Sequence, residues 1–205
     1  SKILTHGRCP REYFWNYILG WRKDNHNVHL VAGQAWHKAM EYLRKHGCHL
    51  DNLPAAWDEY MRVYRPAFPV HMDESFKNKS PGNMQAALTS YIKHHALFDD
   101  YEAVDEGIEI PAVAPISDTQ TICGRIDWLA RRKADGKLVI IDYKTAGQDN
   151  NAWRKQWDLN SQMSTYIHMA RCFFDFDAVW GAMVEVVFLR YSKTGKGMGN
   201  TFDRI

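Results

Sequence analysis

The sequence has no long hydrophobic run, and this absence limits where the protein can reside. No stretch approaches the roughly 18 consecutive apolar residues of a membrane-spanning helix. The first residues also lack the positively charged and then apolar pattern of a signal peptide. We therefore expect a cytoplasmic protein with no membrane partner, from a bacterium or a phage-infected cell.

The sequence also has no excess of one charge. Its 26 basic and 24 acidic residues give a net charge of +2, which does not by itself indicate nucleic acid as a partner. A positive field for DNA must then be local, although short basic clusters are usually solvated surface. The clusters are Arg8 with Arg11, Trp21-Arg22-Lys23, Arg131-Arg132-Lys133, Arg154-Lys155, and Lys193 with Lys196.

Cysteine is scarce and unpaired in sequence. Cys9, Cys48, Cys123 and Cys172 form no CxxC motif, so neither a zinc site nor a thioredoxin-like redox motif is indicated. We expect four reduced thiols.

What the sequence does contain is enough apolar material for one core. With 205 residues, 45% hydrophobic and 13% aromatic, we expect a single domain over residues 1–205. Residues 1–100 are predicted to be mainly helical, and 101–205 to form a sheet core with one further helix. The fold class predicted is α/β, with a small mixed β-sheet flanked by helices.

The periodicity of apolar residues and the positions of proline and glycine predict the elements. The predicted helices cover residues 9–17, 32–45, 54–64, 83–98 and 154–173. The predicted strands cover residues 103–113, 121–130, 138–143 and 182–189. Residues 68–81 are predicted to be a loop, and 195–199 a glycine-rich loop or hairpin.

Charged residues at the end of an apolar strand are the first chemical signal. Asp142 and Lys144 follow the run Leu138-Val-Ile-Ile, and residues two apart on a strand point to the same side. An apolar strand normally excludes charge, so these groups need water, each other or a ligand.

A predicted hairpin brings a second carboxylate to this position. With Asp135-Gly136 as the central residues of a two-residue turn, Asp127 pairs with Lys144 and becomes a diagonal neighbour of Asp142. Two acids this close repel each other unless a cation lies between them, and a divalent metal ion is the usual answer. The alternative is an ion-pair cluster on a structural hairpin.

Two helical pairs accompany this hairpin. His37 and Glu41 lie four residues apart on one helical face, and Gln162 and Tyr166 do the same. Each pair alone is typical of ordinary helix packing, so its weight comes from its occurrence together with the acidic hairpin.

Taken in order, these motifs resemble the RecB-like branch of the PD-(D/E)XK nucleases, which includes CRISPR-associated, phage and recombination exonucleases. The resemblance extends from Cys9 to Tyr166. Its motifs are Cys-Pro-x-x-Tyr at 9–13, Gly-x-x-x-His at 33–37, Gly-x-x-Asp at 124–127, Ile-Asp-Tyr-Lys-Thr at 141–145 and Gln-x-x-x-Tyr at 162–166.

The resemblance implies roles for individual residues. It implies that His37, Asp127, Asp142 and the carbonyl of Tyr143 bind Mg²⁺ or Mn²⁺. Lys144 would act with Asp142 and Asp127 in catalysis. The supporting or DNA-contacting residues would be Gln162, Tyr166, Glu41 and Glu109, with Glu106 as the alternative to Glu109.

Some relatives carry an iron-sulfur cluster, held by one N-terminal cysteine and three clustered cysteines near the C-terminus. Cys9 matches the first position, but Cys172 stands alone, so no cluster is expected.

We therefore expect a metal-dependent deoxyribonuclease, an exonuclease on single-stranded DNA or DNA ends in recombination, repair or phage DNA processing. The alternatives are a catalytically inactive DNA-binding subunit of a recombination complex and a globular scaffold.

Overall fold

The computed structural model describes residues 2–21, 26–95, 99–190 and 199–205. Arg22-Lys23, Lys193, Lys196 and most of the glycine-rich segment 195–199 lie outside these residues. The helices are α1 (Lys2–Arg8), α2 (Pro10–Tyr13), the π-helical turn η1 (Phe14–Ile18), α3 (Val28–His46), η2 (Leu50–Asn52), α4 (Leu53–Tyr64), η3 (Val70–Lys79), α5 (Pro81–His95), α6 (Asn151–Lys155), α7 (Ser161–Phe173) and η4 (Phe176–Ala178). The strands are β1 (Tyr101–Pro115), β2 (Thr121–Arg132), β3 (Leu138–Ala146), β4 (Val179–Phe188) and β5 (Thr201–Arg204).

The strands of the described residues form one five-stranded sheet in the order β1-β2-β3-β4-β5. Only β3 and β4 pair in parallel, and the chain between them passes through α6 and α7. The other neighbouring strands are antiparallel. This mixed sheet flanked by helices confirms the predicted fold class.

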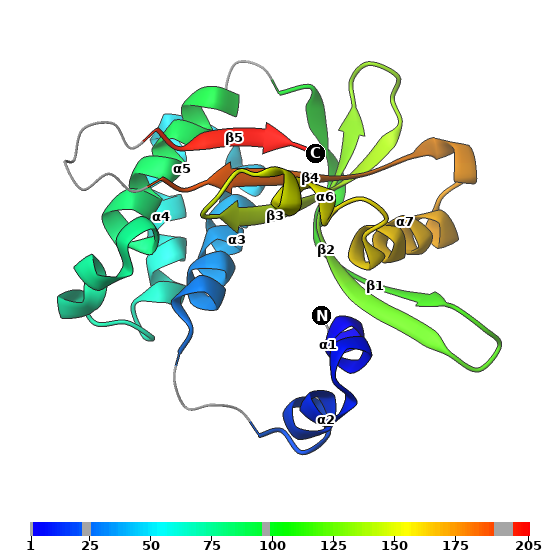
Figure 1. The fold of residues 1–205 in the computed structure, drawn as a ribbon. Coiled ribbons are helices and arrows are strands. Elements are labelled where there is room, and N and C mark those ends of the chain that lie inside the picture. The colour runs from blue at the N-terminus through cyan, green and yellow to red at the C-terminus, as the bar shows by residue number, and fades with distance from the viewer. Residues whose placement is uncertain (1, 22–25, 96–98, 191–198) are drawn as a thin grey trace.

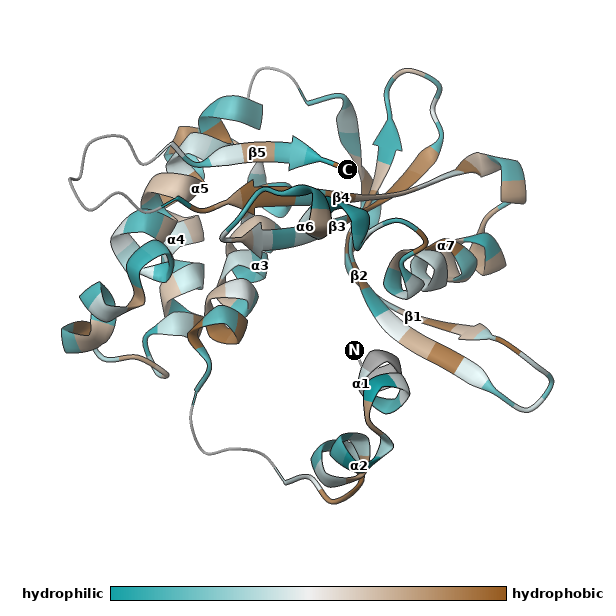
Figure 2. Cartoon of the chain, in the orientation of Figure 1, coloured by the Kyte–Doolittle hydropathy of each residue, from teal (hydrophilic) through white to brown (hydrophobic). Residues whose placement is uncertain are grey.

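The helices cover the sheet from two sides (Figure 1). Helices α3, α4 and α5 share a buried cluster with Trp128, Ile141 and Tyr143 of the sheet. Helix α7 packs over a second cluster that contains Leu138 and Ile140. Figure 2 shows the most hydrophobic colour along β4 near the centre of the sheet, where both clusters meet the strand.

Helix α3 begins and ends where the sequence supplies capping groups. The side chain of Asn27 accepts a hydrogen bond from the amide of His29 at 2.8 Å, and Gly47, at φ 102°, follows the last turn. Its buried residues recur on one side, which packs against α4 and the sheet. His37 and Arg44 lie at the edge of this buried side. The packing of α3 therefore fixes their positions beside the sheet.

The prediction of a two-residue turn between β2 and β3 is wrong. The amide of Arg132 donates to the carbonyl of Lys137 and the amide of Gly136 to the carbonyl of Arg132, so residues 133–136 form a longer loop. Gly136 closes it at φ 72°. The observed pairs, such as Trp128 with Ile141, shift the register by two residues from the prediction. An even shift leaves every side chain on its predicted face, so Asp127 stays beside Asp142.

Other predictions also need correction. The helix predicted over 154–173 is two helices, because Leu159 has φ 51° and Asn160 caps a new helix by accepting from the amide of Gln162 at 2.9 Å. Residues 70–79, predicted as loop, form the 3-10 turns of η3. Helix α1 and strand β5 were not predicted.

Within the described residues, no helix combines the length and the apolar character needed to cross a membrane.

Candidate active site

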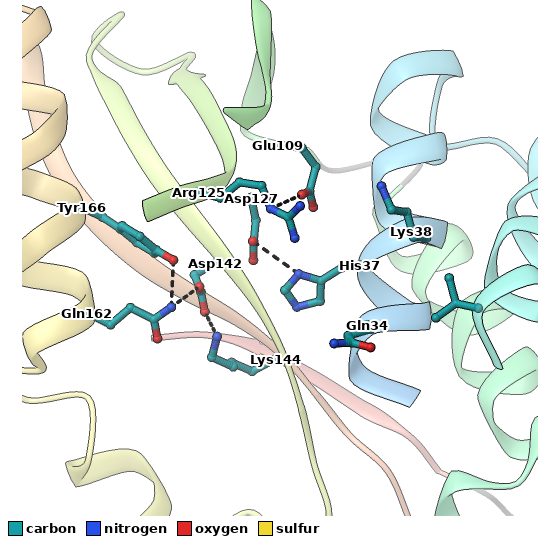
Figure 3. A pocket seen from close by; sticks show the side chains of 11 residues that line it. Gln34, His37, Lys38, Glu109, Arg125, Asp127, Asp142, Lys144, Gln162 and Tyr166 are labelled. Carbon is teal, nitrogen blue, oxygen red and sulfur yellow. Dashed lines mark hydrogen bonds and ion pairs between the residues drawn. The ribbon is translucent and has the colours of Figure 1, made fainter. Parts of the chain in front are cut away.

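A cavity of about 510 Å³ opens between α3, the sheet and α7. Figure 3 shows the side chains of this cavity converging from those elements. Its lining residues are Gln34, His37, Lys38, Val63, Glu109, Arg125, Asp127, Asp142, Lys144, Gln162 and Tyr166. Most of the predicted site residues are therefore brought together here.

Asp142 lies at the floor of the cavity and is 1% exposed. Its Oδ2 is paired with the ammonium group of Lys144, the residue two positions on along β3. Its Oδ1 accepts a hydrogen bond from Nε2 of Gln162 at 3.2 Å, and the same amide nitrogen contacts the hydroxyl of Tyr166 at 2.9 Å. Gln162 of α7 therefore contacts the acid directly, and Tyr166 is connected to it through Gln162.

Asp127 is held by its neighbours in a different way. Its Oδ2 accepts the backbone amide of Tyr143 at 2.9 Å, and its Oδ1 lies 3.3 Å from Nδ1 of His37. The other ring nitrogen of His37, Nε2, lies 2.9 Å from the carbonyl oxygen of Tyr143. Because a carbonyl oxygen can only accept, Nε2 carries a proton, and Nδ1 faces the Asp127 carboxylate.

The two acids have opposite pKa shifts. Burial raises the pKa of Asp142, and the charge of Asp127 adds to this effect, together outweighing Lys144. Burial also acts on Asp127, but the hydrogen bond and charge of His37 outweigh it and lower the pKa. Burial acts to lower the pKa of His37, but the hydrogen bond and charge of the Asp127 carboxylate outweigh it, so the pKa is raised. Paired groups with pKa values driven apart are typical of reactive sites.

Glu109 reaches the cavity through an irregularity in β1. The register between β1 and β2 shifts between Ala103 and Ile108, and Glu109 itself has φ 55°, a conformation that costs a non-glycine residue energy. Its Oε2 lies 2.7 Å from Nε of Arg125, whose side chain is 61% exposed. A ligand atom each of Glu109, His37 and Asp127 lies within 4.8 Å of the others, a spacing compatible with one metal ion.

Two residues considered for the site, Glu41 and Glu106, do not line the cavity. The carboxylate of Glu41 pairs with Lys38 and Lys45, and Glu41 lines a neighbouring groove rather than the cavity. Glu106, the alternative to Glu109, is exposed and lies within the irregular part of β1.

Three further residues that line the cavity were not predicted from the sequence: Arg125, Gln34 and Lys38. Arg125 stands two residues before Asp127 on the same strand, so the period of a strand could have identified it. Gln34 and Lys38 flank His37 on α3.

None of the four cysteines is among the residues that line the cavity. Cys9 caps helix α2, with its Sγ 3.4 Å from the amide of Glu12. Cys48 is partly buried, and Cys123 and Cys172 are exposed.

Comparison with known proteins assigns the chain at the level of a superfamily. A family model described as the PD-(D/E)XK nuclease superfamily matches residues 1–187. No curated protein matches the chain. Among solved structures, "Crystal structure of SSO0001" is similar at 12% sequence identity over 90% of this chain and 68% of that chain, with a TM-score of 0.25.

Proposed function

The chain belongs to the PD-(D/E)XK nuclease superfamily, and we propose that it is a metal-dependent deoxyribonuclease, an exonuclease acting on single-stranded DNA or duplex ends. The observation that supports this proposal is the cavity in which His37, Asp127, Asp142 and Lys144 converge. Buried acids facing an open cavity, with a lysine beside them, are suited to phosphodiester hydrolysis.

The donor atoms fit a divalent cation. Nδ1 of His37 and Oδ1 of Asp127, 3.3 Å apart, must share a proton or a cation, since two lone pairs this close would otherwise repel. We propose His37, Asp127 and Asp142 as ligands, with Glu109 as a further carboxylate and the Tyr143 carbonyl either as a ligand or as the acceptor that orients His37. A bound cation would polarise a phosphoryl oxygen and lower the pKa of a water molecule. A mixed nitrogen and oxygen set suits Mn²⁺ at least as well as Mg²⁺.

The other side chains of the cavity would have separate roles in catalysis and DNA binding. The ammonium of Lys144, paired with Asp142, would orient the attacking water and stabilise negative charge developing on the phosphate. Gln162 and Tyr166 would hold Asp142 in position and contact the DNA. Arg125, whose side chain is largely exposed, would bind a backbone phosphate.

We further propose that residues 1–205 act as one nuclease domain in DNA recombination, repair or phage DNA processing, where partner proteins of a recombination complex could join it. A buried cluster that joins α3, α4 and α5 to the sheet supports a single folding unit. The cytoplasmic location and the expectation of no iron-sulfur cluster remain predictions from the sequence.

The test is digestion of end-labelled DNA, single-stranded and duplex, linear and circular, with Mn²⁺, Mg²⁺ or a chelator. We expect metal-dependent loss of linear DNA while circular DNA survives. Lys144→Ala should reduce the rate by about 10³-fold, because the negative charge developing on the phosphate loses the ammonium group proposed to stabilise it. Lys137→Ala, on an exposed lysine at the turn end of the same hairpin, is the matched control and should cleave like the wild type.

The other outcomes separate the alternatives. Cutting of circular DNA would make the protein an endonuclease. DNA binding without metal-dependent cleavage of any substrate would support an inactive binding subunit and contradict the enzyme. Absence of both binding and cleavage would leave only a structural scaffold.

A further inference from the structure

Arg44 is a buried cation close to the site. It lies seven residues after His37 on α3, which places both residues on one side of the helix two turns apart. Its side chain is 6% exposed. Nη1 lies 2.6 Å from Oδ2 of Asp99, and Nη2 contacts the hydroxyl of Tyr91 and lies 3.4 Å from Oε1 of Glu185.

Two further contacts of Arg44 go to the residues that directly follow the two acids. Nε donates to the hydroxyl of Tyr143 at 2.9 Å, and Tyr143 follows Asp142. The guanidinium carbon lies 3.8 Å from the centre of the Trp128 ring, and Trp128 follows Asp127. One side chain therefore contacts both strands of the acidic hairpin, from the opposite face of the sheet.

Tyr143 connects this contact to the cavity through its backbone. Its amide donates to Asp127, and its carbonyl accepts from His37, each at 2.9 Å. Adjacent residues of a strand point to opposite faces, so fixing Trp128 and Tyr143 on one face fixes the direction of Asp127 and Asp142 on the other.

We propose that Arg44 is a positioning residue that sets the spacing of Asp127, Asp142 and His37, and through it the affinity of the site for a divalent cation. This inference rests on the proposed function, because it assumes that these three groups bind the cation. Arg44 acts through Tyr143 and Trp128 and itself contacts neither cation nor DNA.

The chemistry of arginine matches this role. A planar guanidinium can stack on an indole ring while its edge donates to a phenol and to carboxylates in the same plane, which an ammonium group cannot do. Asp99 and Glu185 pair with the two terminal nitrogens of the guanidinium, so the group has little freedom to turn. Burying these charges costs free energy of folding. A role in fixing the geometry of the site explains why the buried charges are present despite that cost.

The test is Mn²⁺ binding to the full chain without DNA, measured by calorimetry and by the electron paramagnetic resonance spectrum of the bound ion. Arg44→Lys keeps the positive charge but loses the planar fork. Tyr143→Phe removes only the hydroxyl that Arg44 contacts. We expect each to weaken Mn²⁺ binding by about 10- to 100-fold, the usual effect of removing a group that orients metal ligands. The spectrum of the bound ion should also change.

Arg204→Lys is the matched control. Arg204 shares Glu185 and Asp99 with Arg44, and its ring contact is with Tyr101 rather than with the hairpin residues Trp128 and Tyr143. It should bind Mn²⁺ like the wild type even where its stability falls. Thermal unfolding of every variant checks that it is folded at the temperature of the titration.

The outcomes are distinguishable. A wild-type protein that binds no Mn²⁺ would overturn the proposed metal-dependent function. Wild-type binding with an unchanged Tyr143→Phe affinity would overturn the positioning role alone, even where Arg44→Lys fails to fold. A loss in Arg204→Lys equal to that in Arg44→Lys would also overturn it, because the effect would then follow the buried charges in general.

Discussion

Two charged clusters lie close together in this molecule, and they are compensated in opposite ways. In the buried cluster, Glu185 is 3% exposed and is surrounded by Arg44, Arg204 and the hydroxyl of Tyr91. In the cavity cluster, Asp142 is equally buried, but its cation is Lys144 and a second acid, Asp127, faces the same cavity.

The pKa shifts follow this difference. Burial acts to raise the pKa of Glu185, but the two arginines outweigh it and the pKa is lowered. For Asp142 the effect of burial prevails, and the pKa is raised. The carboxylate of the compensated cluster stays ionised beside its fixed arginine partners, whereas the incompletely compensated one retains the capacity to bind a cation.

The largest expected effect is on the buried cluster. Glu185→Gln keeps the shape but leaves two guanidinium groups with Asp99 as their remaining carboxylate. We expect the free energy of unfolding at pH 7 to fall by about 4 kcal/mol, because breaking a buried pair leaves uncompensated charge. Urea denaturation measures it.

Glu59→Gln is the control for this measurement. Glu59 pairs with Arg62, whose side chain is 72% exposed, and an exposed pair contributes less than about 1 kcal/mol. Equal losses in the two variants would mean that the buried cluster contributes no more than a surface pair.

A second effect comes from His95 beside the same cluster. Burial lowers the pKa of His95 to about 4, while the charge of Glu185 only partly opposes it. Its Nδ1 lies 3.2 Å from Nη2 of Arg204, a contact that requires the neutral ring. The unfolded chain therefore binds a proton near pH 6.5 that the folded chain binds only near pH 4.

Stability from this histidine is complete above about pH 6.5 and is lost as the pH falls towards 4, by at most about 3 kcal/mol. Unfolding free energies measured across this range in wild type and His95→Gln check it. The acids titrate in both proteins, so their difference isolates the histidine. If the unfolding free energies of the two proteins changed with pH in parallel, His95 would titrate in the folded protein as it does in the unfolded chain.

The same comparison explains what the sequence could predict. Asp142 with Lys144, and Gln162 with Tyr166, are separated by one strand or helix period, so local spacing predicts that each pair shares a face. Asp127 also kept its predicted side, although the turn was wrong, because the register shifted by an even number of residues.

The buried cluster could not be predicted in this way. Arg44 and Glu185 are 141 positions apart, and Arg44 and Asp99 are 55 apart, so no local period relates them. Their meeting depends on how α3 packs on the sheet. The break between helices at Leu159 was not predicted for a related reason. The apolar pattern continues through it, and only Asn160 marks the start of the new helix.

The smallest expected effect has the opposite sign from the first. In Asp142→Asn, a buried carboxylate whose pKa is raised becomes a neutral amide of the same shape. An acid with a raised pKa in the folded protein lowers stability wherever it is ionised, so at pH 7 the substitution removes an unfavourable term. The lost pair with Lys144 offsets part of the gain.

We therefore expect the cation-free Asp142→Asn protein to be more stable by about 1 kcal/mol, while metal-dependent cleavage is lost. Urea denaturation in chelator, beside Glu185→Gln, measures it. A loss of several kcal/mol would mean that Asp142 is compensated as fully as Glu185, and the acidic hairpin would then be a structural ion-pair cluster. A gain in stability without loss of cleavage would mean that Asp142 takes no part in the reaction. The two measurements together therefore show whether the protein keeps the cavity cluster at the expense of stability.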